Sequence, residues 1–588
     1  MDSLEQGSAP AVEEALAGRS DLDIYGDNKR LLFAVQLRMD IDDIDGLAAE
    51  ALTDGADDKA SDLIHVDRDA GIILLAQGYE SARVRAAAQQ AKAATLHQAV
   101  TWVFSHTTDD TPERLRPTVA EVRAALADDV IREIWVWFVH NLPESENVRR
   151  ELKAIQSTVD AAIRAGYPET KLDIRVDEVG RNTLAKWYES SRTPILVTDE
   201  IPVPVDDSCL TVRGPGWTAY TVTVTADWLN NTYWKYEEKL FSANVRGFLG
   251  ARKSKNNINN GIRETLEGEP GNFWVFNNGI TALVDDASYN IDDKELLIRG
   301  LSIVNGAQTT GAVAKFKEPD ALRDGRIVMR FIKCGDPAIV QKIIRFNNRQ
   351  NVIDPADFRS NDRAQRRLVD EFKALGIEGY TGGRRGRGVD EARKPTGAVD
   401  VASASRALAA YHGEPGIAYN ERRLIWEDER LYRHLFSEDT SAHHMLFCWS
   451  LIKAVEDCKG RLRALEGDLI TGKREQREYF EHPGSILLLV AAIAESMDAI
   501  LGRPIANSFQ PKFKGKPGPT KCVEYWRPVV DALAPFAYRN LESVLKASGP
   551  PRELPKAALQ DFRNRVESWA ESSDERRKTF ADKVRLTT

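Results

Sequence analysis

A chain of 588 residues is too long to bury a single hydrophobic core, so two to four domains are expected. Hydrophobic residues make up 42% of the chain, which excludes an intrinsically disordered protein. The net charge of −9 excludes a uniformly basic coat for nucleic acid but leaves room for local basic patches. The five cysteines are scattered and odd in number, which argues against a disulfide framework and a structural zinc site.

The sequence carries no signal for a membrane or for export. Its apolar runs are all too short to span a bilayer. The acidic N-terminus, MDSLEQGSAPAVEEALAGRSDLD, lacks the basic and apolar regions of a signal peptide. We therefore expect a cytoplasmic protein without a membrane partner.

Hydrophobic patterning predicts α/β structure in the first part of the chain. The segments DLIHV (62–66) and GIILLA (71–76) predict a β-hairpin joined by a polar turn. A helical, Ala-rich stretch follows at roughly 83–100. From 117 to about 205, helices alternate with apolar strands, which favours a parallel or mixed sheet.

A second α/β block is expected from about 217 to 380, and the remainder of the chain has the length and charge pattern of packed surface helices. The predicted fold class is therefore α/β multidomain, with an all-helical C-terminal domain. The main C-terminal helices are expected at 441–465, 484–502, 524–547 and 555–585. The expected domains are 1–110, 111–210, 211–390 and 391–588.

An acidic run marks the region before and within the predicted hairpin. Residues 40–69 hold eleven acidic residues against two basic ones, and such a run is ordinarily a solvated face. However, Asp62 opens one predicted strand and Gln77 lies beside it on the next. This placement resembles the metal site of restriction-endonuclease-like (PD-(D/E)xK, Mrr-type) folds. The resemblance implies Mg²⁺ held by Asp62 and Gln77, where it helps generate a hydroxide that attacks phosphate.

The lysine expected at such a site is missing. Two residues after Gln77 stands Tyr79, which cannot donate a positive charge to the developing negative charge. Lys92, from the following helix, is a candidate substitute, and Glu50 is a candidate further carboxylate. The candidate catalytic residues are thus Asp62, Gln77, Glu50 and Lys92. The alternative is a degenerate domain that still docks on nucleic acid.

Three short segments of the central block are rich in asparagine, glycine and glutamine. FWVFNNGIT (273–281) is expected to place its amides directly after an aromatic strand. LSIVNGAQTT (301–310) is expected to join a strand to a helix that begins near Thr309, and KIIRFNNRQNVID (342–354) to end a helix. Each segment alone predicts a turn. Together they favour a polar ligand pocket, in which backbone N–H groups at a helix start bind phosphate or another anion.

These segments carry a resemblance to a known family. The chain resembles the abortive-infection phage-resistance (AIPR) family in four segments that follow in the family's order and spacing: NVRGFLG (244–250), NNINNGIRETL (256–266), FNNGIT (276–281) and VNGAQTT (304–310). The resemblance covers roughly 217–380 and implies a bacterial anti-phage protein. Many chains of that family carry an endonuclease-like domain at the N-terminal end, with a segment similar to DGADDKASD (54–62) here.

A weaker resemblance concerns the ligand of the central pocket. NGAQTT is similar to segments of DndB-like and ParB-like domains that bind nucleotide phosphates, and FNNRQNVID is similar to a helix of the ParB-like fold. The resemblance implies a nucleotide, although NGAQTT lacks the Arg pair that grips phosphate there, and a nucleic-acid backbone fits the same groups. The candidate ligand residues are Asn277, Asn278, Asn305, Gly306, Gln308, Thr309, Asn348, Arg349 and Gln350.

Arginines outside these segments are candidate contacts to nucleic acid. Arg246 and Arg263 suit bidentate phosphate binding, but each can equally pair with a local carboxylate. The Gly-rich loop GGRRGRG (382–388) either follows a phosphate backbone or serves as a solvated linker, and its basic residues are Arg384, Arg385 and Arg387.

Other enzyme chemistries have no support in the sequence. It has no Walker-type GxxxxGK[ST], no HEXXH and no legible Ser/His/Asp arrangement. Three functions stay open. The first is a metal-dependent nuclease of phage defence. The second is a non-catalytic switch that binds nucleotide, DNA or RNA, and the third is a structural subunit. In the last case, the C-terminal helices would dock a defence-complex partner or a second copy of the chain.

Overall fold

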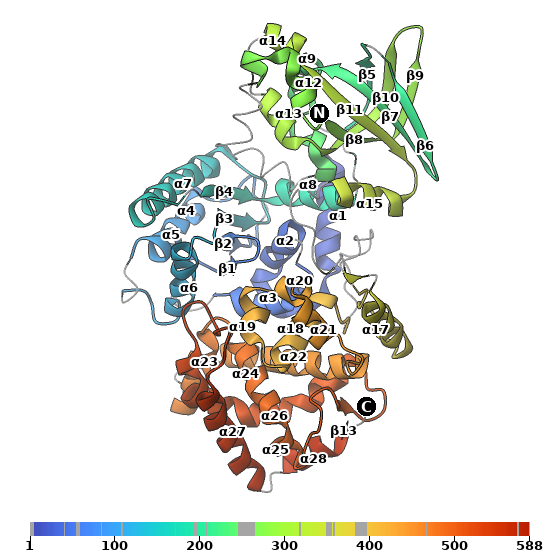
Figure 1. Ribbon diagram of the computed structural model, residues 1–588. Helices are drawn as coiled ribbons and strands as arrows, with labels where there is room; N and C mark the ends of the chain where they lie inside the picture. Colours follow the sequence, from blue (N-terminus) through green and yellow to red (C-terminus); the bar gives the residue numbers. More distant parts are fainter. Residues whose placement is uncertain are drawn as a thin grey trace. The chain divides into compact units, whose positions relative to one another are not determined.

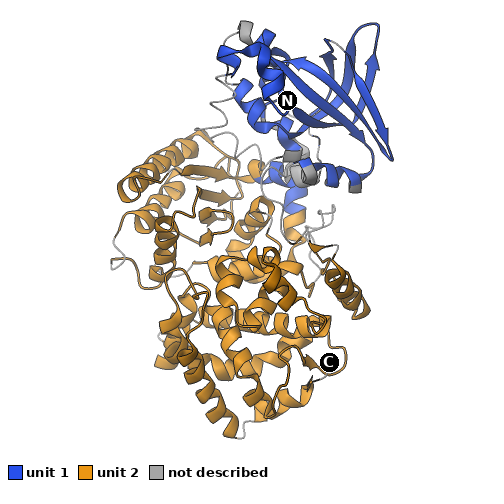
Figure 2. Ribbon diagram, viewed as in Figure 1, with its two compact units in different colours: residues 1–14, 184–353, 386–392 blue, residues 15–183, 354–385, 393–588 orange. Residues whose placement is uncertain are grey.

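The computed structural model forms two compact units (Figure 2). Unit 1 contains residues 1–14, 184–353 and 386–392, and unit 2 contains residues 15–183, 354–385 and 393–588. Among the described residues, no helix is long and apolar enough to cross a membrane. The structure describes residues 5–39, 41–53, 59–83, 85–106, 110–170, 172–192, 195, 197–206, 208–244, 265–314, 316, 319–347, 356, 359–360, 362–382, 397–465, 467, 469–572 and 575–586.

The N-terminal part of unit 2 is a four-stranded mixed sheet, which we call the N-terminal sheet (Figure 1). Its strands lie in the order β1-β2-β3-β4; β1 and β2 are antiparallel, and β2, β3 and β4 are parallel. The elements of the chain up to the end of α8 are α1 (Glu5–Ala17), η1 (Ser20–Asn28), α2 (Lys29–Met39), α3 (Ile44–Ala51), β1 (Leu63–Asp67), β2 (Ile72–Tyr79), α4 (Gln90–Ala94), α5 (Leu96–Phe104), α6 (Arg116–Ala127), β3 (Glu133–His140), α7 (Glu146–Gly166), β4 (Asp173–Val179) and α8 (Arg181–Arg192).

The apolar strands explain how this sheet is covered. Strand β3 reads EIWVWFVH and is buried from Ile134 to His140, which is the pattern of a strand enclosed on both faces. One face packs on helices α5, α6 and α7 through Val100, Val119 and Leu152. A parallel pair needs a long crossover between its strands, and α7 supplies it between β3 and β4.

The C-terminal part of unit 2 is a helical domain built around α22 and α24. Helix α24 reads SILLLVAAIAE and is buried from Ser485 to Ile493, so it belongs in the centre of the bundle. The elements of this domain are α17 (Arg363–Ala374), α18 (Val401–Tyr411), α19 (Pro415–Asn420), α20 (Leu424–Glu427), α21 (Glu429–Leu435), α22 (Ala442–Arg463), α23 (Thr471–Glu481), α24 (Ser485–Glu495), α25 (Met497–Leu501), β12 (Pro511–Phe513), α26 (Pro519–Leu541), η4 (Glu542–Val544), α27 (Lys556–Glu571), α28 (Glu575–Lys583) and β13 (Val584–Leu586).

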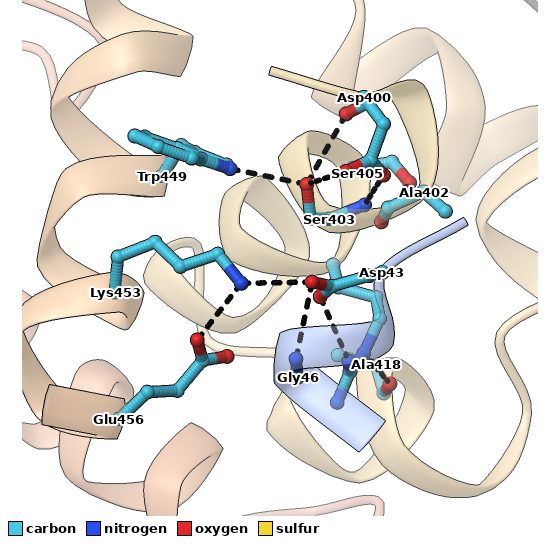
Figure 3. A network of polar contacts seen from close by, with 11 residues as sticks. Asp43, Gly46, Asp400, Ala402, Ser403, Ser405, Ala418, Trp449, Lys453 and Glu456 are labelled. Carbon is cyan, nitrogen blue, oxygen red and sulfur yellow. Dashed lines mark hydrogen bonds and ion pairs between the residues drawn. The ribbon is translucent and has the colours of Figure 1, made fainter. Parts of the chain in front are cut away.

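Helix α22 holds the amino end of helix α3 through a buried lysine. Lys453 Nζ donates to Asp43 Oδ1 and to Glu456 Oε2, each at 2.8 Å (Figure 3). Asp43 is also the N-cap of α3, since its side chain accepts from Gly46 N at 3.1 Å. Burial by itself lowers the pKa of Lys453, but the carboxylates of Asp43 and Glu456 outweigh it and raise that pKa well above its ordinary value. The lysine is therefore charged.

Helix α22 also holds the carboxyl end of helix α3. Lys459 Nζ lies 3.8 Å from Glu50 Oε2, and Arg463 donates to the carbonyl oxygen of Leu52. Leu52 in turn forms a β-bridge to Leu63, the first residue of β1. We call these contacts, together with the bond from Lys453 to Asp43, the α3–α22 clamp. It fastens the helical domain to the chain that leads into the N-terminal sheet.

Unit 1 is built on a seven-stranded sheet in the order β5-β10-β8-β11-β7-β6, with β9 paired to β10. Strands β8 and β11 are parallel, and the other paired strands of this sheet are antiparallel. The elements of unit 1 after α8 are β5 (Val197–Pro204), β6 (Leu210–Gly214), β7 (Trp217–Thr225), α9 (Ala226–Tyr236), η2 (Glu237–Asn244), η3 (Pro270–Asn272), α12 (Phe273–Phe276), β8 (Ile280–Val284), β9 (Asp286–Asn290), β10 (Glu295–Asn305), α13 (Ala307–Ala314), α14 (Pro319–Asp324), β11 (Arg326–Cys334) and α15 (Pro337–Asn347).

The two faces of the unit 1 sheet are covered by different helices. On one face, Val224, Ile303 and Phe331 lie in a core that also contains residues of α9 and α13. On the other face, helix α15 packs through Val340 and Ile343 on a smaller apolar cluster. One residue from each of four neighbouring strands forms that cluster: Ala219, Ile332, Leu283 and Val304.

The structure confirms the predicted hairpin and the helical C-terminal region, and it differs from three expectations. Helices α22 and α24 were expected at the surface, but they are buried in the centre of the bundle, because their apolar residues pack on helices from distant parts of the chain. The N-terminal sheet crosses the boundary expected at residue 110, and β5 joins the central sheet across the boundary expected at 210, because strand pairing is decided by contacts between distant segments. Residues 273–276, expected as a strand, form helix α12. Only Phe273 of this run is buried, so it lacks the packing that stabilises a strand.

We expect the substitution Lys453→Met to lower the free energy of unfolding of unit 2 by about 3 kcal/mol, because it leaves buried carboxylates without their cation. Chemical denaturation measures this loss. Lys473→Met, at an exposed position of the same domain, is the matched control. The double variant Asp43→Asn, Lys453→Met should recover part of the loss, and a single variant as stable as the control would contradict a stabilising clamp.

Candidate functional site

The hairpin of β1 and β2 brings Asp62 and Gln77 together at one end of the N-terminal sheet. Leu63 pairs with Ala76, and Asp62 N donates to Ala76 O at 3.0 Å, so Asp62 stands opposite Gln77. Directly opposite residues of an antiparallel pair share a face of the sheet. Asp62 Oδ2 accepts a hydrogen bond from Gly78 N at 2.7 Å, which fixes one carboxylate oxygen at the strand end.

Lys92 of α4 and Thr95, which joins α4 to α5, complete this group. Gln77 Oε1 accepts from Thr95 Oγ1 at 3.0 Å, and Lys92 Nζ lies 5.8 Å from the centre of the Tyr79 ring. Side chains alternate along a strand, so Tyr79 shares its face with Gln77. The ammonium group of Lys92 therefore lies beside the residue that occupies the expected lysine position.

Glu50 does not belong to this group. It belongs to the α3–α22 clamp, and its Oε2 lies 3.8 Å from Lys459 Nζ. Within the described residues, neither oxygen of Glu50 has a hydrogen-bond partner, although both are buried. Burial lowers the pKa of Lys459 and Glu50 opposes that shift. The prediction of Glu50 as a catalytic carboxylate is thus replaced by a structural role, which follows from contact with a helix some 400 residues further along the chain.

Glu121 of α6 lies in the same interface with the helical domain. Tyr419 Oη donates to Glu121 Oε1 at 2.7 Å across that interface. Burial raises the pKa of Glu121 to about 8, and the nearby carboxylate of Glu50 adds to the shift. Glu121 is therefore protonated at neutral pH, whereas Glu50 has Lys459 as its counter-ion.

Sequence reasoning missed a buried histidine at the same end of the N-terminal sheet. His140, the last residue of β3, pairs with Tyr79 of β2. Its Nε2 lies 3.1 Å from Glu178 Oε1, and its Nδ1 accepts from Leu142 N at 3.2 Å. Because Nδ1 accepts, Nε2 carries the proton that Glu178 receives in its hydrogen bond. No local signal connects His140 to Glu178 in the sequence, because only the pairing of β3 with β4 brings them together.

The donors at the Asp62 end allow a simple test of the magnesium expectation. Among the described residues, no group of three or more His, Cys, Asp or Glu side chains has the arrangement of metal ligands. Asp62 and Gln77 supply two oxygen donors. Magnesium usually keeps several waters and takes one or two carboxylates together with substrate phosphates. These donors therefore fit a magnesium ion whose remaining ligands are water and phosphate.

A cavity of about 240 Å³ opens beside the α3–α22 clamp. Its lining includes Asp45, Asp400 and Lys453. Each of these charged groups already has a partner: Tyr25 donates to Asp45, Ser403 donates to Asp400, and Lys453 donates to Asp43. The acidic lining is thus accounted for by the packing of α3 against the helical domain.

In unit 1, the structure joins two of the three Asn/Gly segments. Asn277 Nδ2 donates to Thr309 Oγ1 at 3.1 Å, and Asn277 Oδ1 accepts from Gly279 N at 2.9 Å. The first bond ties the start of β8 to the first turn of α13. The segments 276–281 and 304–310 therefore meet at one end of the sheet, which we call the strand-end site.

The strand-end site depends on glycines in the left-handed region. Gly306 has φ of +100°, and a Cβ atom there would lie 2.6 Å from the Ile280 side chain. The strand–Asn-Gly–helix order is as predicted, with α13 beginning at Ala307, two residues earlier than expected. Asn305 and Gln308 are half-buried and Asn278 is exposed. Among the described residues, no hydrogen bond is recorded for the side chains of these three, so their amides are available to a ligand.

Several predicted site residues lie outside the described residues. The third Asn/Gly segment is described as far as Asn347, the last residue of α15, whose Nδ2 donates to Ile343 O at 2.9 Å. The positions outside the described residues are Arg246, Arg263, Asn348, Arg349, Gln350, Arg384, Arg385 and Arg387.

Comparison with known proteins supports the family resemblance for the middle of the chain. Residues 241–461 match the model of a family described as AIPR protein. The match spans less than half of the chain; it contains the strand-end site and the helical domain as far as α22, and it leaves out the N-terminal sheet. No curated protein and no solved structure matches the chain.

The buried acid at the interface gives a pH-dependent prediction. The pKa of Glu121 is raised from an ordinary value near 4.5 to about 8, so its contribution to stability is full below pH 4.5 and is lost as pH rises to 8. Glu121→Gln keeps an oxygen acceptor for Tyr419 and cannot ionise. At pH 9 we expect this variant to be more stable than the unmodified protein by on the order of 2 kcal/mol.

Thermal unfolding at pH 5, 7 and 9 measures this difference, which should be near zero at pH 5. Glu113→Gln, at an exposed position of the same domain, is the control and should show no pH-dependent difference. A stability difference that does not grow with pH would contradict a protonated Glu121 in the folded protein.

Proposed function

We propose that this chain is a bacterial abortive-infection protein that acts on nucleic acid as a metal-dependent nuclease. The AIPR family match of residues 241–461 supports the defence role. The observation that carries the nuclease assignment is the shared face of Asp62 and Gln77 at the end of β1 and β2, with the Lys92 ammonium group beside it. The candidate nuclease site is thus Asp62, Gln77 and Lys92.

The chemistry of this proposal assigns a separate role to each side chain. Asp62 and Gln77 would hold magnesium, which supplies a polarised phosphate and a hydroxide nucleophile when bound. Gly78 N fixes the orientation of the Asp62 carboxylate, and Thr95 fixes that of the Gln77 amide. Lys92, which lies over Tyr79, takes the place of the missing lysine and stabilises negative charge on the phosphate oxygens.

The test is a cleavage assay on duplex DNA, single-stranded DNA and RNA with Mg²⁺ or Mn²⁺. Asp62→Asn keeps an oxygen that can accept from Gly78 N but removes the charge, so we expect cleavage to fall roughly 100-fold or more. Lys92→Gln should slow cleavage roughly tenfold or more, because a charge-stabilising donor is lost. Glu113→Gln, exposed in the same domain, should cleave normally. Equal activity in Asp62→Asn and in the control would refute the nuclease site.

A second candidate function is a non-catalytic switch that binds nucleotide or nucleic acid at the strand-end site. The bond from Asn277 to Thr309 favours it, because it places the amides of both segments at the start of α13, where backbone N–H groups attract anions. We expect such binding to persist in EDTA and to weaken roughly tenfold in Gln308→Ala, as measured by isothermal titration.

Binding that disappears on removal of divalent metal would contradict the switch. If neither cleavage nor binding occurs, the remaining assignment is a structural subunit of a defence complex. A stable assembly of defined mass, measured by light scattering, would then be its signature.

A further inference from the structure

On one face of the unit 1 sheet, a row of polar residues follows the apolar row that helix α15 covers. This helix covers the row of residues formed by Ala219, Ile332, Leu283 and Val304, which belong to four neighbouring strands. The next row towards the strand-end site is polar. It consists of Thr221 on β7, Arg330 on β11, Thr281 on β8 and Asn305 on β10. We call it the polar row.

The strand register places these four residues side by side. Arg330 is the Cα partner of Thr221 in the antiparallel pair and of Thr281 in the parallel pair, and Thr281 is the partner of Asn305. Neighbouring strands lie roughly 4.8 Å apart, so the whole row spans about 15 Å. Partners across a sheet share a face. On this face Arg330 is exposed and Thr221 and Asn305 are half-buried, whereas Thr281 is buried beneath them.

Arg330 differs from the other cations of its strand. Arg326 and Lys333 are each held by an aspartate, Asp206 and Asp286 respectively, at 2.6 Å. Arg330 is exposed, and no such ion pair is recorded for it among the described residues. Its guanidinium group therefore keeps its donors for a partner from outside the chain. A planar fork of N–H groups suits the bidentate recognition of phosphate.

The groups around Arg330 suit an anion with several acceptor oxygens, which phosphate provides. Thr221 carries a hydroxyl and Asn305 carries an amide, and both can donate hydrogen bonds beside the guanidinium group. Asn305 also leads directly into Gly306 and the first turn of α13, whose backbone N–H groups favour an anion. The strand-end site, which lacked an arginine in the sequence, thus acquires one from β11.

Exposed aromatic side chains lie next to the same site. Trp274 is 48% exposed and Phe276 is 64% exposed, and both belong to α12. Asn277, which follows Phe276, is tied to Thr309 of α13. Helix α12 packs through Phe273 in the core on the opposite face of the sheet from α15, so these rings lie at the end of the sheet where its two faces meet. Aromatic rings together with cations are the features by which proteins hold single strands, because bases stack on the rings while cations hold the backbone.

We propose that the polar row of unit 1 binds the phosphodiester backbone of single-stranded nucleic acid, with Arg330 as its phosphate anchor and with Trp274 and Phe276 stacking on the bases. This inference rests on the second candidate function and specifies its ligand. We expect this binding to have no sequence preference, because the donors of the polar row bind phosphate and aromatic rings stack on any base. The same phosphate chemistry is also present in a free nucleotide.

The test measures fluorescence anisotropy of a labelled dT12 oligonucleotide, and of the matching U12 RNA, with the full-length protein in EDTA. We expect Arg330→Gln to weaken binding about tenfold and to reduce the salt dependence by about one phosphate contact. The matched control is Arg299→Gln, exposed on β10 of the same sheet beside Asp286 and Glu200. It changes the net charge equally and should bind within about twofold of the unmodified protein.

Two further arms separate the possible ligands. Trp274→Ala should weaken oligonucleotide binding without changing any affinity for ATP, and ATP at millimolar concentration should not displace the oligonucleotide. Complete displacement by ATP would assign the row to a nucleotide and overturn the proposal. Equal weakening in Arg330→Gln and Arg299→Gln, or no binding by the unmodified protein, would overturn it as well.

The outcome is distinguishable from that of the nuclease assignment. Asp62→Asn should bind the oligonucleotide as the unmodified protein does, since Asp62 lies in unit 2 and Arg330 in unit 1. If the protein cleaves nucleic acid and Arg330→Gln binds the oligonucleotide normally, this inference is refuted and the nuclease assignment stands. If Arg330→Gln weakens binding and the protein cleaves no substrate, the nuclease assignment is refuted and this inference stands.

Discussion

One largely buried positive charge connects the two parts of unit 2. Lys453 stands on α22, in the middle of the helical core, and its ammonium group bonds Asp43 at the start of α3. The free-energy cost of desolvating an ion is offset only while its oppositely charged partners stay in contact with it, so this contact favours a single arrangement of α3 and α22. The N-terminal sheet and the helical domain are consequently one compact unit, although they are formed by opposite ends of the chain.

The contacts between α22 and α3 also help to position the candidate nuclease site, because hydrogen bonds to the backbone connect the two. Arg463 bonds the carbonyl of Leu52, and the next residue, Thr53, donates its backbone N–H to the carbonyl of Asp62 at 2.9 Å. The position of Asp62 at the start of β1 is therefore set from the helical domain as well as from its own sheet. The placement of Asp62 opposite Gln77 and the packing of the C-terminal helices are thus connected through hydrogen bonds to the backbone.

In unit 1, the position of the strand-end site depends on where strand β10 ends, at Asn305 and Gly306. The register of β10 against β8 shifts between Ile303 and Asn305, and Gly306 then turns the chain into α13. Only glycine fits this turn, because its φ is positive and the Ile280 side chain fills the space of a Cβ atom. The half-buried amides of Asn305 and Gln308 are therefore held at the end of the sheet.

The sequence by itself determined the local elements. Short apolar runs on either side of a polar turn set the hairpin that carries Asp62 and Gln77. The Asn305-Gly306 pair set the end of a strand and the start of a helix. These features arise from interactions between neighbours in the chain, which a pattern reveals directly.

Only the tertiary structure decided which of these elements meet. It paired β3 and β4 with the hairpin, placed Glu50 against Lys459 instead of Asp62, and set Arg330 in a row with Thr281 and Asn305. Residues 273–276 form a helix, in which Phe273 is buried and Trp274 and Phe276 are exposed. Strand register and burial are properties of contacts between distant segments, and no periodicity within one segment encodes them.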